Sequence, residues 1–134
     1  MKNKKQNNQI VIYQAKSGAI ELRGDFERDT IWATQAQIAS AFGVDVRTIN
    51  EHIKNIYKSG ELGEISTIRN FRIVQKEGKR DIEREVKHYN LDMVLSVGYR
   101  VNSKTATLFR KWATKTLREH ITKGYTINRK RIAG

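Results

Sequence analysis

The chain contains no cysteine and no proline among its 134 residues. The lack of cysteine excludes a disulfide framework, a thiolate nucleophile and a cysteine-ligated zinc site. No apolar run is long enough to span a bilayer, and residues 1–8 lead into no secretory signal. We therefore expect a cytoplasmic protein that does not bind membranes. The absence of proline and of a Gly/Ser-rich linker favours one compact domain with basic ends.

Acidic residues are scarce, with 14 Asp and Glu against 26 Lys and Arg, for a net charge of +12. Such an excess indicates an anionic partner, most often nucleic acid. The excess is distributed unevenly along the chain. Residues 30–60 carry three basic and two acidic side chains, whereas residues 98–134 carry ten basic side chains and the single acid Glu119.

The stretch that begins at Thr34 is typical of two short helices joined by a tight turn. Thr34 and Gln37 match a capping box, Gly43 suits a turn with positive φ, and Asp45 can cap the second helix. Apolar residues of the second helix recur at three- and four-residue spacing: Val46, Ile49, Ile53 and Ile56. The pattern predicts a DNA-binding helix-turn-helix. A helical hairpin used only for packing or partner contact is the alternative.

The outward face of this second helix carries side chains that can hydrogen-bond to base edges and phosphates in a major groove. We expect Arg47 to contact guanine or a phosphate and Asn50 to contact an adenine edge. Glu51 would repel phosphates unless it accepts a hydrogen bond from a cytosine amine. The full predicted set on the recognition helix is Arg47, Thr48, Asn50, Glu51 and Lys54.

Alternating patterns predict strands on both sides of these helices. Residues 10–13 and 20–23 indicate an N-terminal β-hairpin, and a further short strand is expected before Trp32. Residues 67–74 and 84–89 are expected to form a β-wing. The residues expected to contact phosphate from the first helix and the wing are Thr34, Gln35, Lys76, Lys79 and Arg80. The predicted fold class is α+β: a winged helix-turn-helix-like domain with an N-terminal β-hairpin, a β-wing and a long C-terminal helix.

We divide the chain into a disordered basic leader (residues 1–9), the domain itself (10–125) and a basic tail (126–134). Within the domain, Asn90 is predicted to cap a short helix that ends at Gly98. The segment that follows is expected to be a shaped loop, residues 97–103. Tyr99 and Arg100 either project from that loop or belong to a structural junction, with Tyr99 packed and Arg100 holding a helix end.

A long amphipathic helix is predicted from about Ser103 to Lys123, with Gly124 at its end. Its apolar face would pack on the core through Ala106, Phe109, Ala113 and Leu117. The opposite face forms a basic stripe: Lys104, Lys111, Lys115 and Arg118. Because one sign of charge dominates it, this stripe indicates contact with nucleic acid or with an acidic partner. A merely solvated face is the alternative, and the commitment of the apolar face to the core disfavours a membrane-surface helix.

No motif for metal binding or catalysis is present, so we expect no metal, no cofactor, no catalytic residue and no enzymatic activity. The three histidines come from different predicted elements at spacings that match no metal site: His52, His88 and His120. Three carboxylates alternate on one predicted strand, as they would in a nuclease: Asp81, Glu83 and Glu85. The neighbouring Arg80 and Arg84 favour a cross-strand ion-pair face instead.

Several stretches resemble the N-terminal region of the virulence-associated RhuM family of bacterial proteins. They are residues 34–39 (TQAQIA), 50–56 (NEHIKNI), 60–62 (GEL), 87–92 (KHYNLD), 97–103 (VGYRVNS), 109–114 (FRKWAT) and 123–125 (KGY). The resemblance covers roughly residues 10–131 and implies a context of phages and genomic islands more than a mechanism. The Phe-Arg-x-Trp and final Gly-Tyr pattern also resembles the end of BRO-type phage antirepressor domains, which bind DNA.

These observations predict a sequence-preferring double-stranded DNA-binding domain of a RhuM-like transcriptional regulator or antirepressor. A homodimer is a further expectation, because a single helix-turn-helix contacts few base pairs. The alternative is a protein-interaction module of a phage or genomic-island system whose basic helix binds an acidic protein. An RNA-binding or nucleic-acid-processing role has little support.

Overall fold

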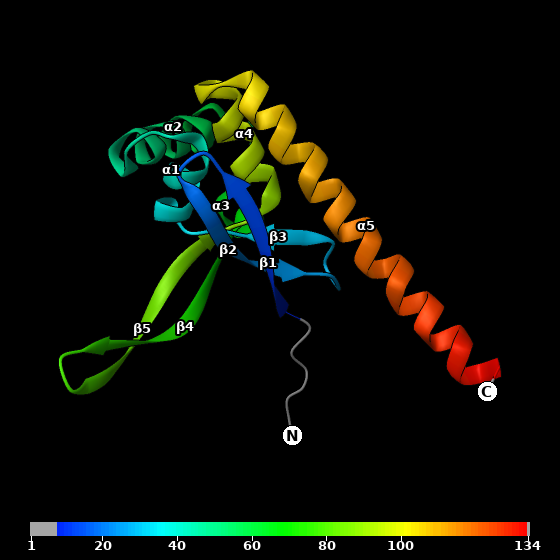
Figure 1. Cartoon of the computed structure of the whole chain (residues 1–134). Helices are drawn as coiled ribbons and strands as arrows, with labels where there is room; N and C mark the ends of the chain where they lie inside the picture. Colours follow the sequence, from blue (N-terminus) through cyan, green and yellow to red (C-terminus); the bar gives the residue numbers. More distant parts are fainter. Residues whose placement is uncertain (1–7, 134) are drawn as a thin grey trace.

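The computed structural model describes the backbone of residues 8–133 and the side chains of residues 9–119. Within this range the chain is α+β, with five helices and two small antiparallel sheets (Figure 1). The elements are β1 (Asn8–Ala15), β2 (Gly18–Asp25), β3 (Thr30–Trp32), α1 (Gln35–Phe42), α2 (Val46–Ser59), α3 (Glu64–Thr67), β4 (Ile68–Glu77), β5 (Arg80–Tyr89), α4 (Leu91–Val101) and α5 (Ser103–Ala133). The predicted disordered leader lies outside the described residues, except that residues 8 and 9 belong to β1.

The first sheet has the strand order β1-β2-β3 and confirms the predicted hairpin and third short strand. Strands β1 and β2 are antiparallel and are joined by the two residues between Ala15 and Gly18. Gly18 has a φ of +130°, a conformation that a residue with a side chain rarely adopts. Tyr13, Ile20 and Leu22 of this hairpin are buried in the common core with the helices.

Helices α1 and α2 are joined by the tight turn that the sequence predicts. Thr34 accepts a hydrogen bond from the backbone of Gln37 (3.1 Å), and the Gln37 side chain accepts one from the backbone of Thr34 (2.9 Å). Gly43 ends α1 with a φ of +71°, and Asp45 caps α2 by accepting from the backbone N–H of Thr48 (2.9 Å). Each cap satisfies backbone groups that a helix end leaves unpaired.

The apolar seam of α2 is buried as predicted, at Ile49, Ile53 and Ile56. Val46 was expected on this seam but is 44% exposed. Val46 is the first residue of α2, so it lies at the tip of the helix, beyond the part that packs on the core. The apolar periodicity therefore identifies the buried face correctly but extends it one turn too far.

Strands β4 and β5 form a two-stranded ribbon that extends away from the body of the molecule (Figure 1). Ten residue pairs, from Ile68–Tyr89 to Glu77–Arg80, join the strands, so both are longer than predicted. The predicted strands ended where the alternation of apolar residues ends. The outer part of the ribbon consists mainly of charged residues that pair across the strands, and it has no such alternation. An isolated bridge between Ala33 and Tyr89 anchors the base of the ribbon to the body. The short helix α3, which precedes the ribbon, was not predicted.

Helix α4 corrects the prediction for the segment 97–103, because the helix does not end at Gly98. It continues through Gly98 to Val101, and Asn102 alone separates it from α5. The Asn102 side chain accepts hydrogen bonds from the backbone amides of Lys104 and Thr105, at 3.0 and 3.1 Å. Gly98 is buried and lies so close to Phe42 that a Cβ atom there would be 2.5 Å from the ring. Gly98 therefore allows α4 to pack closely against Phe42 and does not end the helix.

Helix α5 runs for 31 residues and passes through Gly124, so the predicted helix end there is wrong. A single glycine costs a helix only about 1 kcal/mol relative to alanine and does not by itself end it. Residues 126–133, expected to be a basic tail, are part of this helix. The predicted apolar face is confirmed, with all four residues buried: Ala106, Phe109, Ala113 and Leu117. No helix in the described part of the chain combines the length and apolarity that a membrane crossing needs.

Candidate nucleic-acid interface

The outer face of α2 is polar and accessible. Arg47, Glu51 and Lys54 are exposed, while Thr48 and Asn50 are half-buried. Within the described side chains, no residue of this face takes part in an ion pair. Arg47 and Lys54 therefore have no described carboxylate within ion-pair distance. The pKa of Asp45 is nevertheless lowered by the backbone hydrogen bond from Thr48 and, less strongly, by the charge of Arg47. All five predicted recognition residues lie on one helix, and the apolar seam on its other side fixes the helix to the core.

The N-terminus of α2 is capped by a negatively charged side chain, the carboxylate of Asp45. The hydrogen bond from the backbone N–H of Thr48 holds the pKa of the Asp45 carboxyl below its usual value. The ionised carboxylate therefore occupies the position where the positive end of a helix dipole attracts anions. Because this charge would repel phosphate, a nucleic acid would approach α2 along its side, where Arg47 and Lys54 are exposed.

A hydrogen-bonded group of three side chains joins α1, α2 and β5. The side-chain nitrogen of Gln35 donates to the Asn50 carbonyl oxygen (3.3 Å) and to the hydroxyl of Tyr89 (3.2 Å). The sequence predicted Gln35 and Thr34 as phosphate contacts. In the structure, the Gln35 amide nitrogen is engaged with the protein, and the Thr34 oxygen accepts the capping hydrogen bond. The three-residue group could not be predicted, because its members lie far apart in the sequence.

A groove of about 630 Å³ separates the start of α1 from the ribbon. Its walls are lined by Thr34, Gln35, Ala36, Gln37, Ile73, Gln75, Val86, Lys87 and Tyr89. Lys87 is exposed, makes no ion pair within the described part of the chain, and was missed by the sequence analysis. Only the register, which pairs Lys87 with Asn70 at the base of the ribbon, shows that it belongs beside α1.

The ribbon has paired charges along its length and unpaired cations at its tip. Arg72 lies 3.7 Å from Glu83 and 3.8 Å from Glu85, and Arg84 contacts Glu77 at 2.6 Å. Cross-strand ion pairs are therefore present as predicted, but the predicted partners are wrong: Arg72 pairs with the two glutamates, and Arg80 and Asp81 form no ion pair among the described side chains. The three predicted phosphate contacts of the ribbon are exposed and have no ion-pair partner among the described side chains: Lys76, Lys79 and Arg80.

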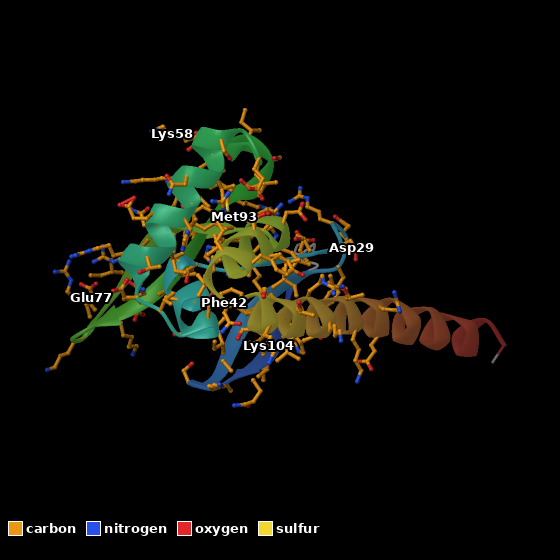
Figure 2. All side chains as sticks on the ribbon, turned by 90° about the horizontal axis from the view of Figure 1, so that it is seen from above. Asp29, Phe42, Lys58, Glu77, Met93 and Lys104 are labelled. Atoms are coloured by element: carbon orange, nitrogen blue, oxygen red, sulfur yellow. The ribbon has the colours of Figure 1, made fainter. Side chains whose placement is uncertain are left out.

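The basic stripe of α5 is exposed as predicted at all four positions: Lys104, Lys111, Lys115 and Arg118. Figures 1 and 2 show that α5 and the ribbon diverge from the body, the ribbon toward one side and α5 toward the other, with α2 on the side of the ribbon. Figure 2 places Lys104 at the root of α5 and Glu77 near the end of the ribbon, well apart. The structure therefore brings α1, α2 and the ribbon together and leaves the basic stripe on another surface.

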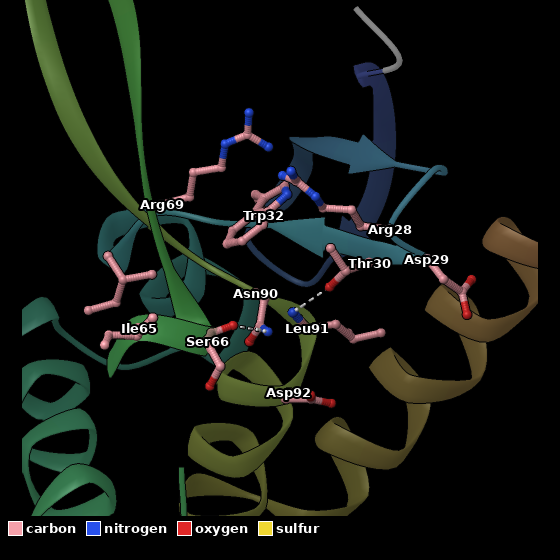
Figure 3. Close-up of a pocket in the computed structure, with 11 residues that line it drawn as sticks. Arg28, Asp29, Thr30, Trp32, Ile65, Ser66, Arg69, Asn90, Leu91 and Asp92 are labelled. Carbon is pink, nitrogen blue, oxygen red and sulfur yellow. Dashed lines mark hydrogen bonds between the residues drawn. The ribbon is translucent and has the colours of Figure 1, made fainter. Parts of the chain in front are cut away.

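A further depression of about 570 Å³ lies at the start of α4 (Figure 3). Its polar groups are largely used by the protein: the backbone N–H of Leu91 donates to the Thr30 hydroxyl (3.0 Å), and the Asn90 side chain donates to the Ser66 carbonyl (3.2 Å). Charges of both signs line it: Arg28, Asp29, Arg69 and Asp92. These observations indicate a structural junction. Across the described residues, no group of histidines and carboxylates could hold a metal ion.

Comparison with known protein families identifies a match to the Virulence protein RhuM family over residues 66–134, just over half of the chain. The chain belongs to this RhuM family. The matched region begins in α3 and includes the ribbon, α4 and α5, while α1 and α2 precede it. No curated protein and no solved structure matches the chain. The similarity to BRO-type antirepressor domains remains a prediction.

Proposed function

We propose that this RhuM-family chain is a sequence-preferring double-stranded DNA-binding protein of a virulence-associated regulator or antirepressor. In this proposal α1 and α2 form a helix-turn-helix, and the β4–β5 ribbon is its wing. The observation that carries the proposal is the outer face of α2, where Arg47 and Lys54 are exposed and form no ion pair with a described side chain. The opposite face of the same helix is buried at Ile49, Ile53 and Ile56, so α2 can present its polar side rigidly.

The proposed mode of binding places α2 in the major groove, which is wide enough for a helix. Arg47 contacts guanine or a phosphate, Asn50 contacts adenine, and Lys54 contacts mainly phosphate. Glu51 accepts from a cytosine amine or disfavours other bases. Contacts to base edges supply the sequence preference in this arrangement, and contacts to phosphates position the protein.

The ribbon supplies phosphate contacts beside α2. Lys87 lies in the groove between the ribbon and α1, and Lys76, Lys79 and Arg80 lie near the tip. Each phosphate neutralised by such a cation releases counterions, so the affinity should fall steeply with salt concentration. The protein proposed here needs no cofactor and has no catalytic role. Binding as a homodimer to a palindromic site remains part of the proposal.

The second candidate function concerns the basic stripe of α5. Figures 1 and 2 show that α5 diverges from α2 and the ribbon. We therefore expect that a straight duplex on α2 does not reach the far part of the stripe. This observation favours a separate acidic partner for α5, such as an acidic protein. The chain would then combine a DNA-binding face with a protein-binding helix, as an interaction module of a phage or genomic-island system.

Selection of bound sequences from a random double-stranded DNA pool, near physiological salt concentration, tests the first proposal. We expect an enriched motif, and a palindrome within it would support a dimer. Arg47→Ala should relax the preference at one position and cost about 1–3 kcal/mol on the selected site. Lys111→Ala is the matched control, since it removes one exposed cation from the other surface and should change affinity much less. Recovery of no DNA would refute the proposal.

If Lys111→Ala and Lys115→Ala weaken DNA binding as much as Arg47→Ala does, the separation of the two surfaces is wrong. In that case the duplex must bend to contact α5, or α5 itself must be the main DNA-binding element. An unchanged DNA affinity, together with loss of binding to an acidic polypeptide such as polyglutamate, would support the second function for α5.

A further inference from the structure

Asn50 does not present its side-chain amide freely, because Gln35 holds it. The Gln35 amide nitrogen carries two hydrogens, and its two acceptors are the Asn50 carbonyl oxygen at 3.3 Å and the Tyr89 hydroxyl at 3.2 Å. Tyr89 is 3% exposed and is anchored by the backbone bridge to Ala33, so it fixes Gln35 in turn. The chain of contacts runs from the base of the ribbon through α1 to the exposed side of α2.

A side-chain amide can face a base in either of two orientations, related by exchange of its carbonyl oxygen and its NH₂ group. The contacts of Asn50 favour one of these orientations. Asparagine has a carbonyl acceptor on one side of its amide and an NH₂ donor on the other. Because the carbonyl oxygen of Asn50 faces Gln35, the NH₂ group of Asn50 faces away from Gln35. Adenine presents a donor and an acceptor in a fixed order, so the direction of the amide decides which base edge fits.

We infer that Gln35 is a positioning residue that sets the base preferred at the Asn50 contact by fixing the direction of the Asn50 amide. This inference rests on the proposed DNA-binding function and specifies how sequence preference arises within it. It replaces the expectation that Gln35 acts as a phosphate contact. The preference at one base pair then depends on a residue of α1 and, through Tyr89, on the base of the ribbon.

The decisive variant is Gln35→Glu, which is nearly isosteric and converts the side chain that donates to Asn50 into an acceptor. The introduced carboxylate can satisfy Asn50 only by accepting from its NH₂ group, so the amide must turn over. A carboxylate at this position should not harm folding, because Gln35 is the first residue of α1 and negative charge is favourable there. Equal midpoints of urea unfolding for the variant and the wild type would confirm that the fold is retained.

The matched control is Gln75→Glu. Gln75 lines the same groove, and the change adds the same charge, but Gln75 has no hydrogen bond to Asn50. Sequence selection should show that Gln35→Glu changes the preferred base at one position by about tenfold and leaves the rest of the motif intact. Gln75→Glu should weaken binding to all sequences alike without changing the motif.

A double variant separates positioning from direct contact. If Gln35 acts through Asn50, then Gln35→Glu should have no further effect on the motif in an Asn50→Ala background. A base preference that still shifts in that background, or a wild-type motif retained by Gln35→Glu, would overturn the inference. Failure of the wild type to select any motif would instead refute the proposed sequence preference, and recovery of no DNA would refute DNA binding itself.

The direction of the amide can also be measured without DNA. In the free protein, the Asn50 NH₂ protons should exchange rapidly with water, and their NMR signals can be assigned by their loss in Asn50→Ala. Gln35→Glu should protect one of these protons, because it then donates to the carboxylate. Unchanged protection would overturn the inference whatever the DNA experiments show. Tyr89→Phe, which removes the second acceptor of Gln35, should broaden the base preference at the same position.

Discussion

Gly98→Ala tests the close packing of three helices in the core. In the middle of a helix this substitution normally stabilises by about 1 kcal/mol, because alanine has the higher helix propensity. Here the added Cβ would lie 2.5 Å from the Cζ and 2.8 Å from the Cε1 of Phe42, and 3.1 Å from the Cβ of Ala106. The first two distances are far below van der Waals contact, so the ring or the helices must move.

The Phe42 ring has little room to move. It is 7% exposed and packs against the ring of Phe109, with centroids 5.9 Å apart. Overpacking of a dense core costs about 1–3 kcal/mol. Subtracting the gain in helix propensity leaves a net destabilisation of up to roughly 2 kcal/mol for Gly98→Ala.

Urea unfolding of four proteins measures this effect: the wild type, Gly98→Ala, Phe42→Leu and the double variant. We expect Gly98→Ala to lower the free energy of unfolding in the wild-type background. In the Phe42→Leu background, where the ring is absent, the same change should become neutral or stabilising. Stabilisation by Gly98→Ala in the wild type, or an equal cost in both backgrounds, would refute the proposed contact with Phe42.

Three further predictions concern stability. Thr34→Ala should cost about 1 kcal/mol of unfolding free energy because it removes the α1 capping box, while Thr34→Ser, which keeps the capping hydroxyl, should cost much less; urea midpoints compare the two. Burial lowers the pKa of His88, so the unfolded chain binds a proton that the folded chain excludes. Stability should therefore fall as the pH drops below about 6.5, and His88→Phe should remove that part of the pH dependence; a variant with the full dependence would contradict this. The exposed ion pair of Arg100 with Glu61 (2.8 Å) should contribute less than about 1 kcal/mol in a double-mutant cycle, and a larger coupling would contradict its assignment as a surface pair.

The segment 97–103 shows where sequence patterns mislead. Gly98 followed by Asn102 and Ser103 is typical of a helix that ends at the glycine and continues as a loop. In the structure α4 does end in this segment, but at Asn102 and not at Gly98. Tyr99 and Arg100 lie on the last turns of α4. The Tyr99 hydroxyl accepts from the Arg110 side chain (3.1 Å), which lowers the pKa of Tyr99, and Arg100 binds Glu61 just after α2. The segment is therefore a junction between two helices, but the expectation that Tyr99 is packed there is wrong, because Tyr99 is 43% exposed.

The sequence by itself determined the features that depend on neighbours along the chain. The caps at Thr34, Asp45 and Asn90, the turn at Gly43 and the apolar face of α5 were all predicted and confirmed. Each of these depends on hydrogen bonds within three or four residues or on the period of a helix. Local spacing contains that information in full, so no knowledge of distant segments was needed.

Only the tertiary structure decided which of these local elements meet. The contact between Gln35, Asn50 and Tyr89 joins residues that are 15 and 54 positions apart. The close approach of Gly98 to Phe42 depends on how α4 crosses α1, which no local pattern specifies. Likewise, the charge of α5 is evident from composition, but its position away from α2 follows from the packing of its apolar face on the core. Long-range packing fixes these relations because side chains from separate elements must fill one dense interior.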